Sequence, residues 1–154
     1  MKNEKIMLSE HFSLREMTRT SVKAENVPGE KEVENLRRLC GWLEKLRKRW
    51  NERYADIGNG GMEEPLIINS GYRSAAVNKA VGGAPTSNHL TGCAVDIRVA
   101  GLEQLLRYAV ILLDISDESK EDFDELLLER NGAVMWLHFA VRPKENRRRV
   151  RIIG

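Results

Sequence analysis

The stretch Ser87 to Asp96, SNHLTGCAVD, constrains what this chain can fold into more than any other feature. It carries a histidine, His89, and seven residues later a carboxylate, Asp96, with small residues between them. Its second half predicts a strand, because apolar and polar residues alternate there. Asp96 then shares one face with Ala94 and Arg98, while the opposite face points into a core. That core face consists of Val95, Ile97 and Val99.

A second strand-like run, Trp136–Val141, places His138 on the face opposite to its own apolar residues. If the two strands are neighbours, Asp96 and His138 lie on the same side, and His89 reaches over from the loop. Two neutral imidazoles and one carboxylate, with a fourth position left to water, are the ligand set of a catalytic zinc site. We therefore expect one zinc ion at His89, Asp96 and His138. The alternative is that each histidine is hydrogen-bonded structurally and that the aspartate forms a salt bridge.

These residues resemble a known family. The pattern SxHxxGxAxD at residues 87–96, followed by WxH at 136–138, resembles the zinc D-alanyl-D-alanine carboxypeptidase and endolysin family. That family includes L-alanyl-D-glutamate endopeptidases and D-Ala-D-Ala dipeptidases, and is related in fold to the hedgehog signalling domain. The segments FSLREM, SGYRS and VGG fit the same family, so the resemblance covers roughly residues 11–141. These segments are residues 12–17, 70–74 and 81–83.

The resemblance implies zinc-dependent hydrolysis of a peptide bond in bacterial peptidoglycan, next to a D-amino acid, of carboxypeptidase or endopeptidase type. Zinc with three protein ligands activates water and polarises a carbonyl, which suits peptide hydrolysis. Two alternatives remain open. One is a zinc-binding but inactive module, as in hedgehog domains, that binds wall peptide or a protein. The other is a structural phage component.

The catalytic base departs from the family pattern. Many relatives carry an acidic residue three positions before the final histidine, and here that residue is Met135, which cannot carry a proton. Glu129 is the expected substitute, because it ends a strand that should pair with the His138 strand. Glu125, on the same face of that strand, is the second choice.

Two further residues are expected to meet substrate. Arg73 in the SGYRS segment resembles the family arginine that faces the substrate, where its charge can stabilise an oxyanion or bind a carboxylate. Ser87 is expected to hydrogen-bond substrate or to orient the loop. Trp136 can line the cleft or belong to the core. His11 lies outside both motifs, and we do not expect it to bind the metal.

Composition limits the remaining choices. With 154 residues, of which 42% are hydrophobic and 31% charged, residues 1–154 are expected to form a single domain. The net charge of +2 does not indicate a nucleic-acid partner. No window reaches the ~18 apolar residues of a membrane span. The first residues lack a secretory signal, so we expect a cytoplasmic monomer, released to the cell wall as a phage or prophage lysin. Cys40 and Cys93 suggest neither a metal site nor a disulfide.

The predicted fold class is α+β, with a small antiparallel sheet that carries the zinc site on one face and helices packed on the other. Helices are expected over 29–54, 75–81 and 101–114, and strands over 66–70, 94–99, 123–129 and 136–141. The buried side of the 101–114 helix should comprise Leu102, Leu105, Leu106, Ala109 and Leu113. An acidic connection follows over 114–122, and an Asn-Gly turn joins the last two strands. The glycine-rich stretch 56–65 is not a phosphate loop. The basic tail, about 142–154, is either a flexible arm or an edge strand at 150–153.

Overall fold

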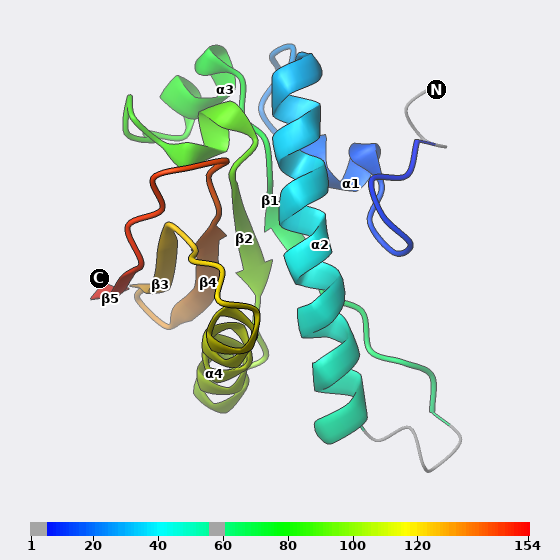
Figure 1. Cartoon of the computed structure of the whole chain (residues 1–154). Coiled ribbons are helices and arrows are strands. Elements are labelled where there is room, and N and C mark those ends of the chain that lie inside the picture. Colours follow the sequence, from blue (N-terminus) through cyan, green and yellow to red (C-terminus); the bar gives the residue numbers. More distant parts are fainter. Residues whose placement is uncertain (1–5, 56–60) are drawn as a thin grey trace.

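A computed structural model describes residues 6–55 and 61–154 of the chain. The first five residues of the predicted glycine-rich loop, 56–60, lie outside the described residues. The order of elements along the chain is shown in Figure 1. The helices are α1 (Leu14–Thr18), α2 (Glu30–Arg53), α3 (Ala75–Ala80), the short 3₁₀ helix η3 (Asn88–Thr91) and α4 (Leu102–Ser119). The strands are β1 (Ile68–Ser70), β2 (Ala94–Arg98), β3 (Glu125–Asn131), β4 (Val134–Ala140) and β5 (Arg149–Ile153).

The strands form one five-stranded sheet in the order β1-β2-β4-β3-β5. The first three pairings are antiparallel, and β5 adds to β3 in parallel. The α+β class with a mostly antiparallel sheet is therefore confirmed. Of the two possibilities for the tail, the structure has the edge strand, which begins at Arg149 rather than Val150.

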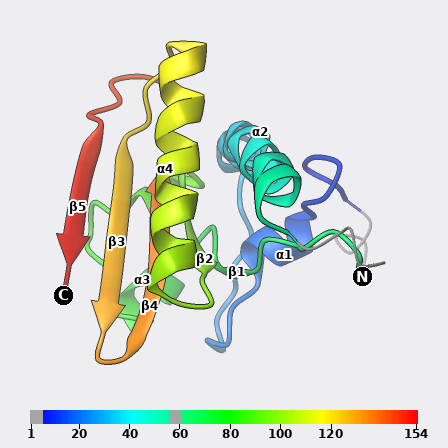
Figure 2. The ribbon, with the colours of Figure 1, turned by 90° about the horizontal axis from the view of Figure 1, so that it is seen from below.

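Helices α2 and α4 cover the apolar face of this sheet (Figure 2). Trp42 of α2 stacks against Phe139 of β4 with ring centroids 5.4 Å apart, and Trp50 contacts Tyr108 of α4 at 5.0 Å. Ile97, Leu137 and Phe139 are fully buried in this layer. Because side chains alternate along a strand, burial of these residues turns the polar residues between them to the opposite face.

Helix α4 corrects two of the predictions. It continues to Ser119, so Asp114, Asp117 and Glu118 belong to the helix rather than to a connection. Its buried stripe is also rotated, because Leu102 and Leu106 are 55% and 47% exposed. The residues that α4 buries are Leu105, Tyr108, Ala109, Ile111, Leu112, Ile115 and Ser116. The apolar residues allow two helical faces, and contact with α2 and the sheet selects one of them.

The other elements follow their local signals with small shifts. Ser74 accepts a hydrogen bond from Val77 N and caps α3, as predicted. Strand β1 is shorter than predicted and begins at Ile68. In the hairpin between β3 and β4, Asn131 pairs with Val134, so the loop is Gly132 and Ala133, one residue later than the Asn-Gly turn. Gly132 has φ +62°, a conformation that favours glycine.

Candidate metal centre

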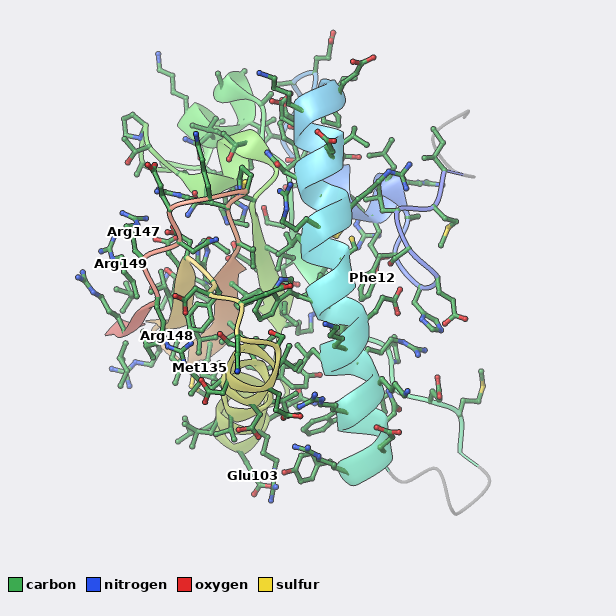
Figure 3. The ribbon with its side chains drawn as sticks, in the orientation of Figure 1. Phe12, Glu103, Met135, Arg147, Arg148 and Arg149 are labelled. Carbon is green, nitrogen blue, oxygen red and sulfur yellow. The ribbon has the colours of Figure 1, made fainter. Side chains whose placement is uncertain are left out.

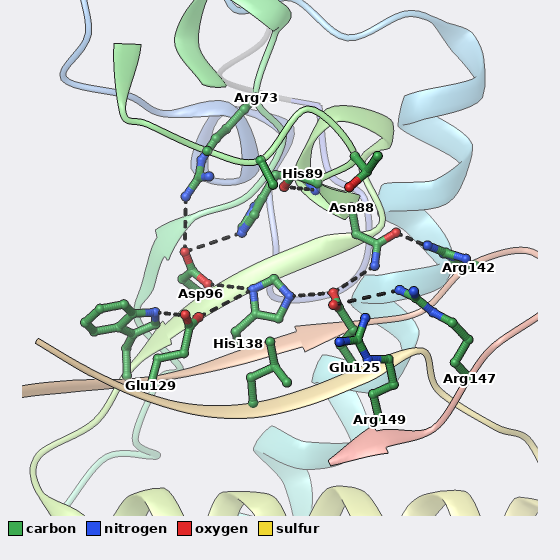
Figure 4. A pocket seen from close by; sticks show the side chains of 16 residues that line it. Arg73, Asn88, His89, Asp96, Glu125, Glu129, His138, Arg142, Arg147 and Arg149 are labelled. Atoms are coloured by element: carbon green, nitrogen blue, oxygen red, sulfur yellow. Dashed lines mark hydrogen bonds and ion pairs between the residues drawn. The ribbon is translucent and has the colours of Figure 1, made fainter. Parts of the chain in front are cut away.

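The site is built where β2, β4 and β3 lie side by side. Asp96 pairs directly with His138, and His138 pairs with Leu127, so their side chains share the face of the sheet turned away from α2 and α4. Helix η3 brings His89 to the same place. Together these elements line a cleft of about 620 Å³ that reaches from Arg73 to Arg149 (Figure 4).

The three expected ligands converge. One potential ligand atom from each of His89, Asp96 and His138 lies within 4.8 Å of the others, and all three residues are buried. Asp96 Oδ2 is 3.4 Å from His89 Nε2, and Asp96 Oδ1 is 3.0 Å from His138 Nδ1. Three ligand atoms that lie this close together can all bind a single ion.

The tautomer of His89 fits a metal ligand. Its Nδ1 lies 2.7 Å from the carbonyl oxygen of Gly71, which can only accept a hydrogen bond. Nδ1 therefore carries the proton, and the lone pair of Nε2 points toward Asp96. Metal-binding histidines commonly donate their other ring nitrogen in this way. The donor set of this site therefore suits zinc.

The ring of His138 is held at Nε2, the nitrogen that faces away from Asp96. Its Nε2 is 2.9 Å from Glu125 Oε1, so Nδ1 is left for Asp96 and the candidate metal. The amide of Asn88 donates to the same Glu125 oxygen at 2.8 Å. Glu125, the second choice for the base, is thus placed as the carboxylate partner of a ligand histidine.

The charges of these buried groups are coupled. Burial by itself would raise the pKa of Asp96, but its close contacts with the imidazoles of His138 and His89 outweigh burial and hold the pKa well below its usual range. Burial would likewise lower the pKa of His138, but hydrogen bonds to Asp96 and Glu125 raise it to about 9. The cleft therefore favours positive charge between these carboxylates.

Glu129 also points into the cleft. Its Oε2 accepts a hydrogen bond from Trp136 Nε1 at 3.0 Å and lies 3.8 Å from His138 Nδ1. Burial raises the pKa of Glu129, and the charge of Asp96 adds to this effect. Met135 faces the core on the other side of β4. Glu129 of β3 therefore lines the cleft, whereas Met135 does not.

Arg73 lies at the end of the cleft opposite to Arg149 (Figure 4). Its Nη2 is 3.3 Å from Asp96 Oδ2, and its Nε donates to Ser70 Oγ at 3.1 Å. Ser87 lines the cleft too, but its hydroxyl accepts a hydrogen bond from His89 N and caps η3. This contact corresponds to the second of the two expected roles of Ser87, orientation of the loop.

Close packing explains the glycine in this loop. Gly92 ends η3 with φ +73°. A Cβ at this position would lie 2.5 Å from the carbonyl oxygen of Glu32, at the start of α2. Only glycine lets the loop approach α2 this closely, and this approach fixes where η3 holds His89.

Sequence reasoning missed a polar network that supports the site. Asp124 is fully buried, and its carboxylate binds Arg147 at 2.8 and 3.0 Å, Arg142 at 3.2 Å and the Asn88 amide at 2.8 Å. Burial would raise the pKa of Asp124, but Arg147 and Asn88 lower it to about 2. The signal in the sequence was the basic tail. Two of its arginines, Arg142 and Arg147, pair with the buried carboxylate of Asp124.

His11 lies in a separate cluster. Its Nδ1 is 2.7 Å from Glu44 and 3.4 Å from Glu10, so these three residues form a second group with metal-ligand spacing. Two of the three are exposed, and the ion pair with Glu44 accounts for the position of His11. His11 is not among the residues that line the cleft.

Comparison with known families agrees with this geometry. A family model described as Peptidase M15 matches residues 10–111, about two thirds of the chain. The matched region contains Arg73, His89 and Asp96, whereas His138 and Glu129 lie beyond it and are placed by the sheet. No curated protein matches the chain. None of the described helices is long and apolar enough to cross a membrane.

Proposed function

Because this chain belongs to the peptidase M15 family, we propose that it is a zinc-dependent enzyme that hydrolyses a peptide bond in bacterial peptidoglycan. Family membership assigns the general role of a zinc metallopeptidase, and peptidoglycan is our inference about the substrate. The observation that carries the proposal is the convergence of His89, Asp96 and His138 in an open cleft.

We assign the three converging residues as the ligands of one zinc ion. When bound, zinc would activate a water molecule and polarise the carbonyl of the substrate. Glu125 would hold the His138 ring in register through its 2.9 Å contact with Nε2.

Proton transfer falls to Glu129. A general base must lie within hydrogen-bond reach of the attacking water, directly or through one water molecule, and its pKa should approach the working pH. Glu129 has a raised pKa and lies 3.8 Å from His138 Nδ1, one of the nitrogens assigned to the metal. It can therefore take a proton from water and return it to the leaving amine.

Arg73 has the charge and position to stabilise the oxygen of the attacked carbonyl. Its guanidinium lies beside Asp96 and lines the cleft. Its Nε, Nη1 and Nη2 each donate one hydrogen bond, to Ser70, Asn78 and Asp96 respectively. The second N–H of each Nη is then left for an oxyanion or a carboxylate. Ser87 would act by capping η3 and so by orienting His89.

Digestion of purified peptidoglycan tests this function. We expect the zinc-loaded protein to release fragments that mass analysis assigns to a bond next to a D-amino acid. His138→Ala should abolish both zinc binding and cleavage, whereas His11→Ala, a histidine outside the cleft, should retain both. Zinc binding without any cleavage would instead favour an inactive wall-binding module. Release to the cell wall as a phage lysin stays a prediction.

A further inference from the structure

The end of the cleft near β5 is lined by arginines that the proposed chemistry does not use. Arg142, Arg147 and Arg149 line the same cleft as the candidate metal ligands. Figure 3 shows Arg147 and Arg149 on the side of the molecule away from α2, and Figure 4 shows both at the end of the cleft away from Arg73. Arg142 and Arg147 are held by Asp124, and because Asp124 is fully buried, this pairing anchors them.

Arg149 differs from its neighbours in its contacts. It pairs with Glu125 in the parallel ladder, so its side chain lies on the face of the sheet that carries the site. Among the described residues, its guanidinium has no hydrogen-bond or ion-pair partner. The nearby Glu125 carboxylate already accepts hydrogen bonds from His138 and Asn88. Arg149 as a residue is partly buried, and its guanidinium donors can bind an anion of the substrate in the cleft.

The sheet sets the distance of Arg149 from the reaction. Strand β5 is two strands away from β4, which carries His138. Neighbouring strands are ~4.8 Å apart, so this offset is roughly 10 Å. An extended peptide advances ~3.3 Å per residue, so a substrate that runs across the strands would cover this offset in about three residues.

We propose that Arg149, supported by Arg147, binds a carboxylate of the peptide substrate about three residues from the scissile bond, and that the enzyme therefore selects acidic peptides. This inference rests on the proposed function and specifies its substrate. The planar guanidinium of arginine matches a carboxylate with two parallel hydrogen bonds, which makes the contact selective as well as attractive.

The test measures binding of soluble stem peptides from peptidoglycan to the full, zinc-loaded chain. The Glu129→Gln background is used to slow turnover during titration calorimetry. Three forms of each peptide are compared: with all carboxylates free, with only the C-terminal carboxylate amidated, and with all carboxylates amidated. Arg149→Gln is matched by Arg130→Gln, an exposed arginine on the other face of neighbouring β3.

We expect full amidation to weaken binding about tenfold or more in the parent protein, as for loss of a charge-assisted contact. Arg149→Gln should remove most of this preference, Arg149→Lys should keep part of it, and Arg130→Gln should keep all of it. The singly amidated peptide shows whether the bound carboxylate is terminal or internal. Equal binding of free and fully amidated peptides, or a preference that survives in Arg149→Gln, overturns the subsite while the proposed function stands. Absence of any peptide binding would overturn both.

Discussion

Two glutamates four residues apart on one face of β3 occupy different environments. Glu125 accepts hydrogen bonds from His138 and Asn88, and these bonds lower its pKa. Glu129 receives a hydrogen bond from Trp136, and burial raises its pKa. An ionised carboxylate suits the orientation of a ligand, whereas a carboxyl with a raised pKa suits proton transfer. The surroundings therefore shift the pKa values of the two glutamates in opposite directions, which is consistent with the different roles that we propose for them.

Glutamine substitutions separate these roles. Glu129→Gln should lower kcat by about 10²- to 10⁴-fold and leave zinc affinity unchanged, because the proton carrier is lost and the ligands remain. Glu125→Gln should weaken zinc binding by about tenfold, and its activity should recover at high zinc concentration. Chelator competition and peptidoglycan digestion measure the two quantities. Full activity in Glu129→Gln would remove Glu129 as the base.

Asp124 predicts a dependence of stability on pH. Its pKa is about 2 in the folded protein against an ordinary 3.8, because Arg147, Asn88 and Arg142 favour the charged form. A lowered pKa adds stability that is fully present above pH ~4 and is lost as the pH falls through 2. The shift corresponds to about 2 kcal/mol.

Urea unfolding of the wild type and Asp124→Asn between pH 7 and 2 measures this contribution. The free-energy difference between the two proteins should be largest above pH 4 and shrink toward pH 2. A difference that does not change with pH would show that the charge of Asp124 is not what stabilises the fold.

At the scale of elements, α4 shows how packing selects a helical face. The leucines of this helix share one broad side, but only Leu105 and Leu112 among them are buried, because the buried face of α4 is set by contact with α2 and the sheet. Burial rather than residue type therefore decides how much each leucine contributes to the free energy of unfolding.

Two identical substitutions test the rotated face of α4. Leu112→Ala should cost about 2–5 kcal/mol of unfolding free energy, because Leu112 is fully buried and leaves a cavity. Leu106→Ala, at a position that is 47% exposed, should cost less than ~1 kcal/mol. Denaturant midpoints measure both. A larger cost for Leu106→Ala than for Leu112→Ala would favour the buried face that was predicted from the sequence.

At the scale of the whole molecule, the candidate ligands connect distant parts of the chain. They come from η3, β2 and β4, so a bound ion would link the loop to the centre of the sheet. A ligand that binds only the folded state stabilises it by mass action.

Zinc should therefore raise the melting temperature. Zinc at 100 times its Kd contributes about 2.7 kcal/mol, which is an increase of about 5–10 °C for a domain of this size. A chelator should reverse the increase, and His138→Ala should abolish it, as followed by circular dichroism. His11→Ala is the control. Loss of the increase in His11→Ala, but not in His138→Ala, would place the ion at the Glu10, His11 and Glu44 cluster instead.

The sequence by itself determined what local periodicity and residue chemistry can encode. Alternation put Asp96 and His138 on the polar faces of their strands, and the pairing of β2 with β4 bears this out. The same alternation put Glu125 and Glu129 on one face of β3, as observed. Such patterns are local, since a strand has two faces whatever it packs against.

Only the tertiary structure decided the rest. The different surroundings of Glu125 and Glu129 depend on partners from η3 and β4, and the buried face of α4 depends on α2. The place of Arg149 in the cleft depends on β5 joining β3 in parallel. Each of these outcomes is set by contacts between residues far apart in the chain, and no local pattern carries that information.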